Sequence, residues 1–313
     1  MIMNERYKKQ VALLIRIMPS VYKIEDFAVH CGTAINLFIR DMPRYSVDID
    51  LTYLPIKNRE ESFKEISMHL SLLKQQIERT IPGIKVVHRI NVLKLFCTYK
   101  EATVIIEVNG IKRGVIGKVQ EIALSLKAQQ EFSMSCTARI VPFSILYGGK
   151  IAAALGRQHP RDLFDYKHME INSFDEVKEG LLFYLLSSDK PILESLQPNP
   201  IDQNQALEKQ FTGMTDTKFD YKDYKLAREK LIDEVNKNLT EIDKEFILSF
   251  ESGEPDWDKC IVGDLSEFPA IKWKLQNINI LKIKNRAKYD KGVENLRVFL
   301  IIYNWTFQYT CIV

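Results

Sequence analysis

Two aspartates one pleat apart give the strongest chemical signal in the sequence. Polar and apolar residues alternate strictly from Ser46 to Leu51, which is the pattern of a half-buried strand. The alternation places Ser46, Asp48 and Asp50 on one face of a strand predicted at residues 45–54. Two carboxylates about 6 Å apart repel by roughly 3 kcal/mol at an effective dielectric near 20. A divalent cation removes this repulsion, and Mg²⁺ commonly takes one or two protein carboxylates together with substrate phosphates. The alternative is an exposed edge strand with a solvated acidic face.

Three further features have the residue types that nucleotidyl transfer requires. Gly32 and Thr33 form a glycine turn near a predicted helix start, which offers backbone N–H groups and a hydroxyl to phosphates. Glu107 adds a third carboxylate on a later strand. Lys150 and Arg157 share one face of a downstream helix and would neutralise a leaving pyrophosphate. Two Mg²⁺ ions held by the acids would clamp the triphosphate and activate the attacking hydroxyl. Solvated strand and helix faces remain the competing interpretation.

The elements that must position these residues alternate along the first half of the chain. Residues 1–40 read as helical with a break at Pro19, and residues 58–80 form an amphipathic helix. Strands are predicted at 84–92, 93–99 and 103–109. This order predicts an α/β or α+β fold with a mixed sheet flanked by helices.

The second half of the chain reads as mainly helical. We expect one domain over residues 1–145 and a helical C-terminal domain over 146–313. The polar stretch at 197–222 predicts a loop or lid, and residues 224–250 predict a helix. Residues 271–288 carry six cations between apolar residues, which suits RNA phosphate contacts or a plain solvated amphipathic helix.

Composition excludes several classes of protein. A net charge of +3 among 44 basic and 41 acidic residues permits nucleic-acid binding without arguing for it. The five cysteines lack C-x-x-C spacing, so they indicate neither a zinc ribbon nor a disulfide framework, and we expect free thiols in a reducing cytoplasm. Residues 1–10 are too polar for a signal peptide, and the apolar run at 298–313 is too short to span a bilayer. We therefore expect a cytoplasmic protein without a membrane partner.

The order and spacing of the motifs resemble one family of enzymes, the AbiEii/AbiGii-type nucleotidyltransferase toxins of the DNA polymerase β-like superfamily. Four blocks carry the resemblance: Cys31 to Leu37 with Arg44 to Leu51, Ile105 to Asn109, Lys150 to Asp165, and Lys272 to Asn277. The third block is the most specific, because glycine turns and Asp-x-Asp pairs recur throughout the superfamily. The family acts in bacterial toxin–antitoxin and phage abortive-infection systems.

The resemblance implies roles for ten residues of the motifs. It implies an N-terminal nucleotidyltransferase domain in which Asp48, Asp50 and Glu107 are ligands of Mg²⁺, or of Mn²⁺ as the alternative ion. Glu107 would be a ligand or the base. Asp165 would complete the catalytic group by holding Lys150 or Arg157 in place. The implied nucleotide-binding residues are Gly32, Thr33, Arg44, Ser46, Lys150 and Arg157.

The resemblance also implies a substrate and a partner. We expect transfer of a nucleoside monophosphate from an NTP to an RNA, with tRNA favoured, and a cognate antitoxin encoded nearby. Two alternatives stay open: a protein that binds nucleotide without transferring it and acts through a protein partner, or a transferase for a small-molecule or protein hydroxyl. Cys31 replaces the first glycine of the family's usual Gly-Gly-Thr, which keeps the binding-only alternative open. Asp162 is expected to cap a helix or pair with Arg161.

Overall fold

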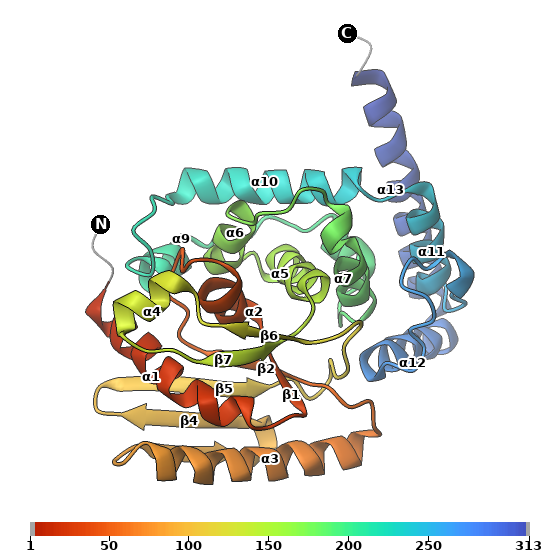
Figure 1. The fold of residues 1–313 in the computed structure, drawn as a ribbon. Coiled ribbons are helices and arrows are strands. Elements are labelled where there is room, and N and C mark those ends of the chain that lie inside the picture. The colour runs from red at the N-terminus through yellow and green to blue at the C-terminus, as the bar shows by residue number, and fades with distance from the viewer. Residues whose placement is uncertain (1–3, 311–313) are drawn as a thin grey trace.

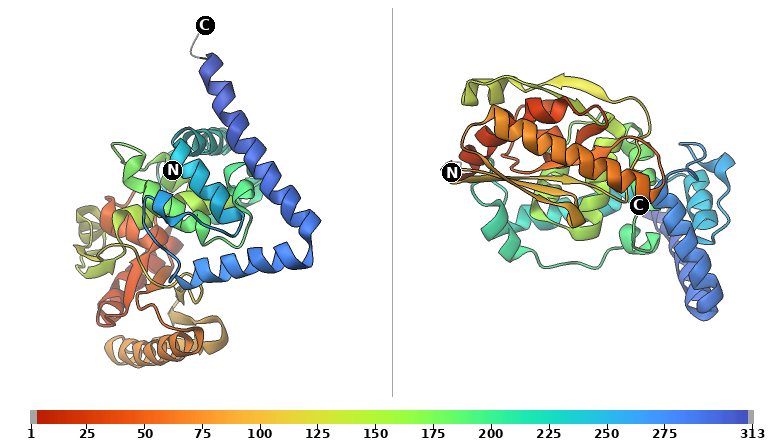
Figure 2. Two further views of the ribbon diagram at one scale, coloured as in Figure 1. Left: turned by 90° about the vertical axis from the view of Figure 1, so that its right-hand side faces the viewer. Right: turned by 90° about the horizontal axis from the view of Figure 1, so that it is seen from below.

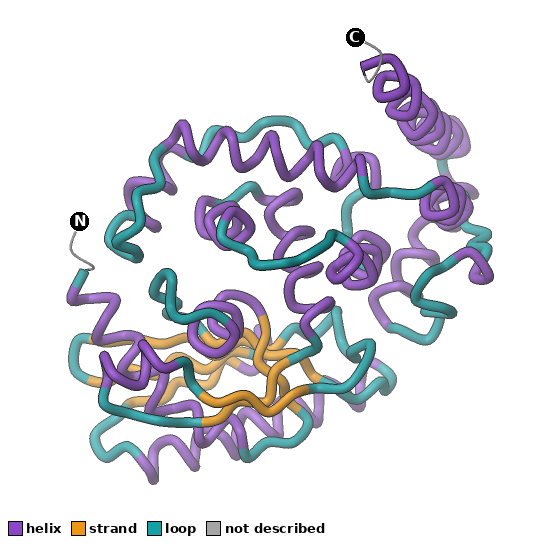
Figure 3. Tube along the Cα trace, turned by 45° about the horizontal axis from the view of Figure 1, so that its top comes forward, coloured by secondary structure: helices purple, strands orange, loops and turns teal. Residues whose placement is uncertain are grey.

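A mixed seven-stranded sheet forms the core of the structure, a computed structural model that describes residues 4–310, with side chains up to residue 302. The strands, in the order β3-β4-β5-β2-β1-β7-β6, form one layer among the helices (Figure 3). Their bounds are β1 Phe27–His30, β2 Ile49–Tyr53, β3 Lys85–Arg89, β4 Lys94–Tyr99, β5 Ala102–Val108, β6 Gln120–Ala123 and β7 Thr137–Ile140. β2 runs parallel to β5 and antiparallel to β1, which in turn runs parallel to β7. The predicted mixed sheet is therefore confirmed.

Two long helices cover one face of the sheet. α1 (Glu5–Tyr22) packs on β5 and β7, and α3 (Arg59–Thr80) packs on β3 and β4 and also contacts α1. Figure 1 shows α3 below the sheet. The buried residues Ile66, Leu70 and Leu73 recur at helical spacing along α3 and form its sheet-facing side. The predicted helix at 58–80 is confirmed.

The other face of the sheet carries a short helix, α2 (Cys31–Thr33), continued by a π-helical turn at Ala34–Ile39, and the buried helix α5 (Phe143–Arg157). α5 crosses α7 (Asp175–Leu186) at very close range (Figure 1). A Cβ on Gly148 would lie 2.2 Å from the backbone of Gly180, and a Cβ on Gly180 would lie 1.9 Å from the Ser144 carbonyl oxygen. Only glycine allows this crossing, which holds Lys150 of α5 beneath the cavity described below.

The remaining helices build the rest of the C-terminal half. They are α4 Leu126–Phe132, α6 Pro160–Lys167, α8 Ile192–Leu196, α9 Asn204–Ala206 with a π-helical turn at Leu207–Phe211, α10 Tyr221–Lys237, α11 Glu241–Glu251, α12 Pro269–Lys284 and α13 Arg286–Thr310, with 3₁₀ turns at Ile90–Val92 and Trp257–Lys259. α11, α12 and α13 lie together at one side of the molecule (Figure 1). Figure 2 shows α13 leaving α12 at a sharp angle and extending away from the body.

The helix predicted over residues 1–40 is wrong at residues 23–30, and the chain is helical again at 31–39. Strand β1 lies within residues 23–30, and Pro19 lies inside α1 instead of ending it. All four residues of β1 are buried, so no polar-apolar alternation marks the strand in the sequence. The helix predicted at 224–250 is likewise divided, because Thr240 and Asp243 form a capping box that starts α11.

Strand boundaries also differ from the prediction. β2 begins only at Ile49, so Asp48 lies just before the strand, and β3 ends at Arg89 in a 3₁₀ turn. The sequence did not indicate β6 and β7. β4 and β5 agree with the predicted strands to within one residue, and burial alternates along β5 with Glu107 on the less buried side. The segment at 197–222 is mainly loop, with short helical turns at residues 204–211.

The predicted division between residues 145 and 146 falls inside α5 and stays a prediction. No helix between residues 4 and 310 is long and apolar enough to cross a membrane. Part of the apolar run predicted at 298–313 belongs to α13, and residues 311–313 lie outside the described residues. Cys31, Cys97, Cys136 and Cys260 are free thiols as predicted, and Cys311 lies in the part that is not described.

Candidate active site

A cavity of about 200 Å³ opens where β2 and β5 meet α2 and α5. It is lined by Cys31, Gly32, Arg44, Ser46, Asp48, Asp50, Ile105, Glu107, Lys150, Arg157, Arg161 and Asp162. The structure thus places eight of the ten predicted site residues around one cavity. The other two, Thr33 and Asp165, lie directly behind it, since both are buried and bonded to residues that line it.

Two aspartates in this cavity have little compensating charge. Asp50 on β2 lies opposite Glu107 on β5 in the register of the sheet, and Asp48 precedes the same strand. Burial, together with the neighbouring Asp48, raises the pKa of Asp50 to about 6. Burial also raises the pKa of Asp48, whose ion-pair partner Arg161 is 3.8 Å away. Both carboxylates are therefore poised to gain from an added cation.

The donor set fits a magnesium ion that is shared with a substrate. Mg²⁺ is usually held by one or two carboxylates plus phosphate oxygens, which is what Asp48 and Asp50 offer on one cavity wall. Glu107 instead forms a 2.6 Å ion pair with Lys94 of the adjacent strand. Within the described residues, no three His, Cys, Asp or Glu side chains are grouped closely enough to hold a metal ion. Glu107 as a third ligand stays a prediction.

Opposite the aspartates lies a buried network of cations and acids. The Lys150 Nζ lies 2.9 Å from Asp162 Oδ1 and 3.0 Å from Asp165 Oδ2, and its side chain is 3% exposed. Burial alone would lower the pKa of Lys150, but the two carboxylates outweigh it, and the pKa is raised. Arg157 Nε donates to Asp162 at 2.5 Å, while the Arg157 side chain is 63% exposed. Lys150 is therefore held as a charged group, and Arg157 is the more accessible cation.

Asp165 connects this network to the glycine turn. It accepts two hydrogen bonds from Arg44, at 2.7 Å from Nε and 2.6 Å from Nη2. Asn36 donates to Asp165 at 3.1 Å and to the Gly32 carbonyl at 2.9 Å. Asp165 contacts Lys150, as the sequence predicted, whereas Arg157 binds Asp162. Because Asp165 is fully buried behind the wall, it positions the cations and is not exposed to substrate.

The prediction for Asp162 is wrong. His159 is the N-cap of α6, since its Nδ1 accepts a hydrogen bond from the Arg161 N–H at 3.2 Å. Asp162 points inward instead and binds Lys150 and Arg157. The reason is the left-handed residue Gln158 (φ 49°), which ends α5 and folds α6 back against it. The same turn removes Arg161 from the face of α5.

The glycine turn is packed too tightly for a side chain. A Cβ on Gly32 would lie 2.8 Å from Arg44 Nη2 and 3.0 Å from Ser46 Oγ. The Thr33 hydroxyl donates to the Asp48 carbonyl at 2.5 Å and lies 3.0 Å from Ser46 Oγ. Gly32 therefore allows Arg44 and Ser46 to pack against the turn, whereas Thr33 anchors the segment that carries Asp48.

Cys31 adopts a left-handed conformation (φ 57°) at the start of α2. This conformation favours glycine and costs another residue about 1 kcal/mol. Burial, and then Asp50, raises the pKa of the thiol to about 12, so the group is a neutral thiol at physiological pH.

We expect Cys31→Gly to stabilise the protein by up to about 1 kcal/mol, because glycine adopts this conformation without strain. Urea unfolding of the two proteins checks the difference. Ser133→Gly is the matched control, since Ser133 is also left-handed (φ 51°) but exposed at the end of α4. A Cys31→Gly protein that is less stable than wild type would contradict backbone strain at Cys31.

A second hollow of about 360 Å³ adjoins the first and shares Cys31, Asp50, Glu107 and Arg157 with it. Its wall adds His30, Asn109, Lys112, Tyr184 and Lys190, none of which the sequence singled out as functional. The Tyr184 hydroxyl lies 2.6 Å from His30 Nε2, and the two rings stack. Burial, with Lys150 and Lys112 nearby, lowers the pKa of His30 to about 3, so the imidazole is neutral. Sequence signals existed for Asn109, which ends the second motif block, and for Lys112, which follows the Glu107 strand closely.

The fourth motif block does not form one exposed basic face. The predicted amphipathic segment at 271–288 is divided between α12 and α13, and Lys274 is buried. Its Nζ donates to the Lys190 carbonyl at 2.6 Å, which fastens α12 to the wall of the second hollow. Lys274 is therefore the one of the six predicted cations that is buried, whereas Lys272 and Trp273 are exposed. RNA contact by this segment stays a prediction.

Comparison with known proteins identifies a family and a similar fold. The family model of the nucleotidyl transferase AbiEii toxin of type IV toxin–antitoxin systems matches residues 13–277. Among solved structures, MenT4, a nucleotidyltransferase toxin from Mycobacterium tuberculosis H37Rv, has a similar fold with a TM-score of 0.57 at 12% sequence identity. The match covers 87% of this chain and 93% of MenT4. No curated protein sequence matches the chain.

Proposed function

Because the chain belongs to the AbiEii family of nucleotidyltransferase toxins, we propose that it transfers a nucleoside monophosphate from an NTP to a hydroxyl of an RNA, with tRNA as the favoured acceptor. Membership in a type IV toxin–antitoxin family implies a cognate antitoxin as partner. One observation carries the proposal: two under-compensated carboxylates face a cluster of fixed cations across a single cavity. This arrangement suits a triphosphate with its metal ion.

The proposed reaction is a displacement at the α-phosphorus of the NTP. The acceptor oxygen forms a bond to this phosphorus, the bond to the bridging oxygen breaks, and pyrophosphate leaves. Asp48 and Asp50 would hold Mg²⁺, which when bound supplies Lewis-acid stabilisation to the phosphates. Glu107, which faces Asp50 across the strand pair, is our candidate for the base that takes the hydroxyl proton.

The cations have separate tasks in this proposal. Arg157 is exposed to the cavity and neutralises charge that develops on the pyrophosphate, whereas Lys150 is fixed by two carboxylates and supplies a preorganised charge below it. Arg44, which Asp165 holds at two points, packs directly against Gly32 and adds a fixed charge beside the glycine turn. None of these groups needs to reorganise when the phosphates arrive.

The test is transfer of label from each radioactive NTP in turn to total bacterial tRNA with Mg²⁺, compared with Asp48→Ala. We expect label on the RNA with wild type only, and none in the presence of EDTA. Asp258→Ala, which removes an exposed acid near α11, is the matched control and keeps full activity. Nucleotide binding without label on any RNA would instead favour the binding-only function or a small-molecule or protein acceptor.

A further inference from the structure

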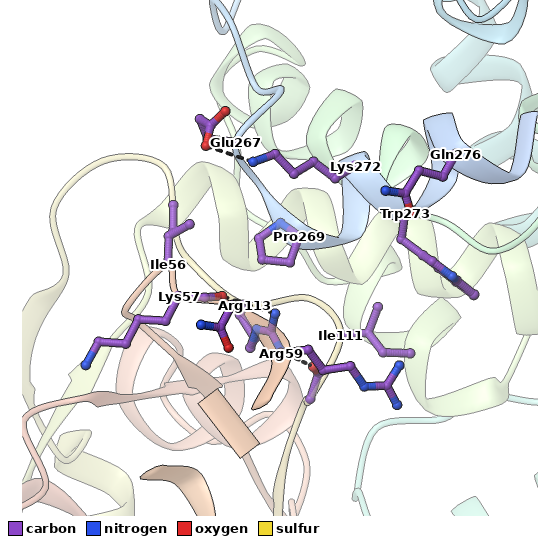
Figure 4. Close-up of a pocket in the computed structure, with 12 residues that line it drawn as sticks. Ile56, Lys57, Arg59, Ile111, Arg113, Glu267, Pro269, Lys272, Trp273 and Gln276 are labelled. Atoms are coloured by element: carbon purple, nitrogen blue, oxygen red, sulfur yellow. Dashed lines mark hydrogen bonds and ion pairs between the residues drawn. The ribbon is translucent and has the colours of Figure 1, made fainter. Parts of the chain in front are cut away.

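A groove of about 520 Å³ lies between α12 and the two loops that follow β2 and β5 (Figure 4). It is lined by Ile56, Lys57, Asn58, Arg59, Gly110, Ile111, Arg113, Glu267, Pro269, Lys272, Trp273 and Gln276. The proposed reaction uses none of these residues. The groove, which we call the α12 groove, therefore needs its own explanation.

Arg113 is the most unusual residue in the α12 groove. It is 4% exposed, and no carboxylate within the described residues is paired with it. Its Nη1 donates to the Gly110 carbonyl at 3.0 Å and its Nη2 lies 3.4 Å from the Lys57 carbonyl, while Nε has no partner. Burying a guanidinium without a counter-charge costs free energy, so a bound anion would be stabilised at this site.

The other charged residues of the α12 groove also favour binding of an anion. Arg59 is exposed near Arg113, and burial followed by the charge of Arg59 lowers the pKa of the Arg113 guanidinium. Lys272 is paired with Glu267 at 2.8 Å, which is the only acid among the lining residues. Trp273 is 43% exposed on the same wall. Cations beside an exposed aromatic ring are the usual elements of a single-strand nucleic-acid site.

The α12 groove is next to the second hollow, and one loop separates them. Both are built from one loop: Asn109 and Lys112 line the second hollow, while Ile111 and Arg113 line the α12 groove. The α12 helix is fixed to the other wall of that hollow by the bond from Lys274 to the Lys190 carbonyl (2.6 Å). A strand lying in the groove would therefore contact the loop that also forms a wall of the second hollow.

We propose that the α12 groove binds a single-stranded segment of the acceptor RNA, with a phosphate at Arg113 and Arg59 and a base stacked on Trp273. This inference rests on the proposed function, because it assigns a surface to the same RNA acceptor. A phosphate suits the site better than an acidic protein segment does, since the exposed ring of Trp273 offers a base a stacking surface beside the guanidinium groups. The RNA supplies the anion that Arg113 lacks.

Binding of a fluorescein-labelled 12-nucleotide single-stranded RNA, followed by anisotropy at several salt concentrations, tests the inference. We expect Arg59→Gln to weaken binding about tenfold and to reduce the slope of log K against log salt by about 1. Trp273→Ala should weaken binding at least about fivefold with the slope unchanged. Arg79→Gln is the matched control, because Arg79 is also exposed but lies at the opposite end of α3, roughly 30 Å away along the helix.

Activity measurements distinguish the inference that the groove binds RNA from the proposal that the protein transfers a nucleotide. If wild type labels RNA, Arg59→Gln should raise KM for RNA and leave kcat and KM for the NTP unchanged. Unchanged RNA affinity in both Arg59→Gln and Trp273→Ala would overturn the groove while leaving the proposed function intact. Tighter binding of a poly-glutamate peptide than of RNA through the same residues would also overturn it, in favour of an acidic protein. RNA binding that both variants lose supports the groove even if the transfer assay fails.

Discussion

Asp50→Asn is expected to lower kcat/KM for nucleotidyl transfer by at least about 10³-fold. Asn keeps the shape of the side chain but removes the charge that would hold Mg²⁺ beside the α-phosphate, and the loss of one such electrostatic contact in a transition state typically costs this much. The measurement is initial-rate transfer at saturating RNA with the NTP varied. Residual activity within tenfold of wild type would contradict a metal-ligand role for Asp50.

The same substitution should stabilise the metal-free protein. Asp50 has a pKa of about 6 in the folded state, against about 3.9 in an unfolded chain, because its charge is buried near Asp48. The folded state therefore binds the proton more tightly, so wild-type stability rises as pH falls from 6 to 4. Asn carries no charge at any pH, so we expect Asp50→Asn to be more stable by about 1–2 kcal/mol above pH 6, after allowance for solvent screening.

Urea unfolding of both proteins in EDTA at pH 7.5 and at pH 4.5 measures this gain. The difference in free energy of unfolding between the two proteins should reach its full value at pH 7.5 and should be smaller at pH 4.5. Mg²⁺ with an NTP should then stabilise wild type only. Asp50→Asn that is less stable than wild type at pH 7.5 would show that the charge already has a structural partner.

Lys150→Met is expected to destabilise the fold by about 3 kcal/mol and to weaken NTP binding at least tenfold. Met fills the volume of the lysine stem but leaves Asp162 and Asp165 buried with one cation fewer, and breaking a buried ion pair from one side is expensive. Chemical unfolding gives the stability, and titration with a fluorescent NTP analogue gives the affinity. Stability within 0.5 kcal/mol of wild type would contradict the network.

Two variants make this result specific. Asp162→Asn combined with Lys150→Met should recover at least about 1 kcal/mol, because it removes one of the two buried negative charges that Lys150 no longer balances. Lys178→Met is the matched control, since Lys178 of α7 forms a similarly buried 2.7 Å ion pair with Asp243 of α11, away from the cavity. It should destabilise the fold to a similar degree and leave NTP affinity unchanged. Weaker NTP binding in both Lys150→Met and Lys178→Met would mean that the loss of affinity follows from the lower stability and not from removal of a nucleotide contact.

The common orientation of the candidate metal ligands Asp48 and Asp50 could be predicted from the local sequence pattern. The alternation at 46–51 and along β5 is a local property of extended chain, so it predicted that Ser46, Asp48 and Asp50 share a face, and all three line one cavity. The glycine turn and the cations of α5 were also recognisable, because their types and spacing repeat a family pattern. Such signals depend on a few neighbouring residues and survive without knowledge of the fold.

The ion-pair partners of the charged residues became known only from the three-dimensional structure. The left-handed turn at Gln158 sends Asp162 to Arg157, and the close crossing at Gly148 and Gly180 buries Lys150 between two acids. Strand β1 was also missed, because all four of its residues are buried and no alternation marks it. That Arg113 is buried and pairs with no carboxylate of the described residues likewise follows only from the structure. Pairing and burial depend on residues far apart in the chain, and local periodicity contains no information about those distances.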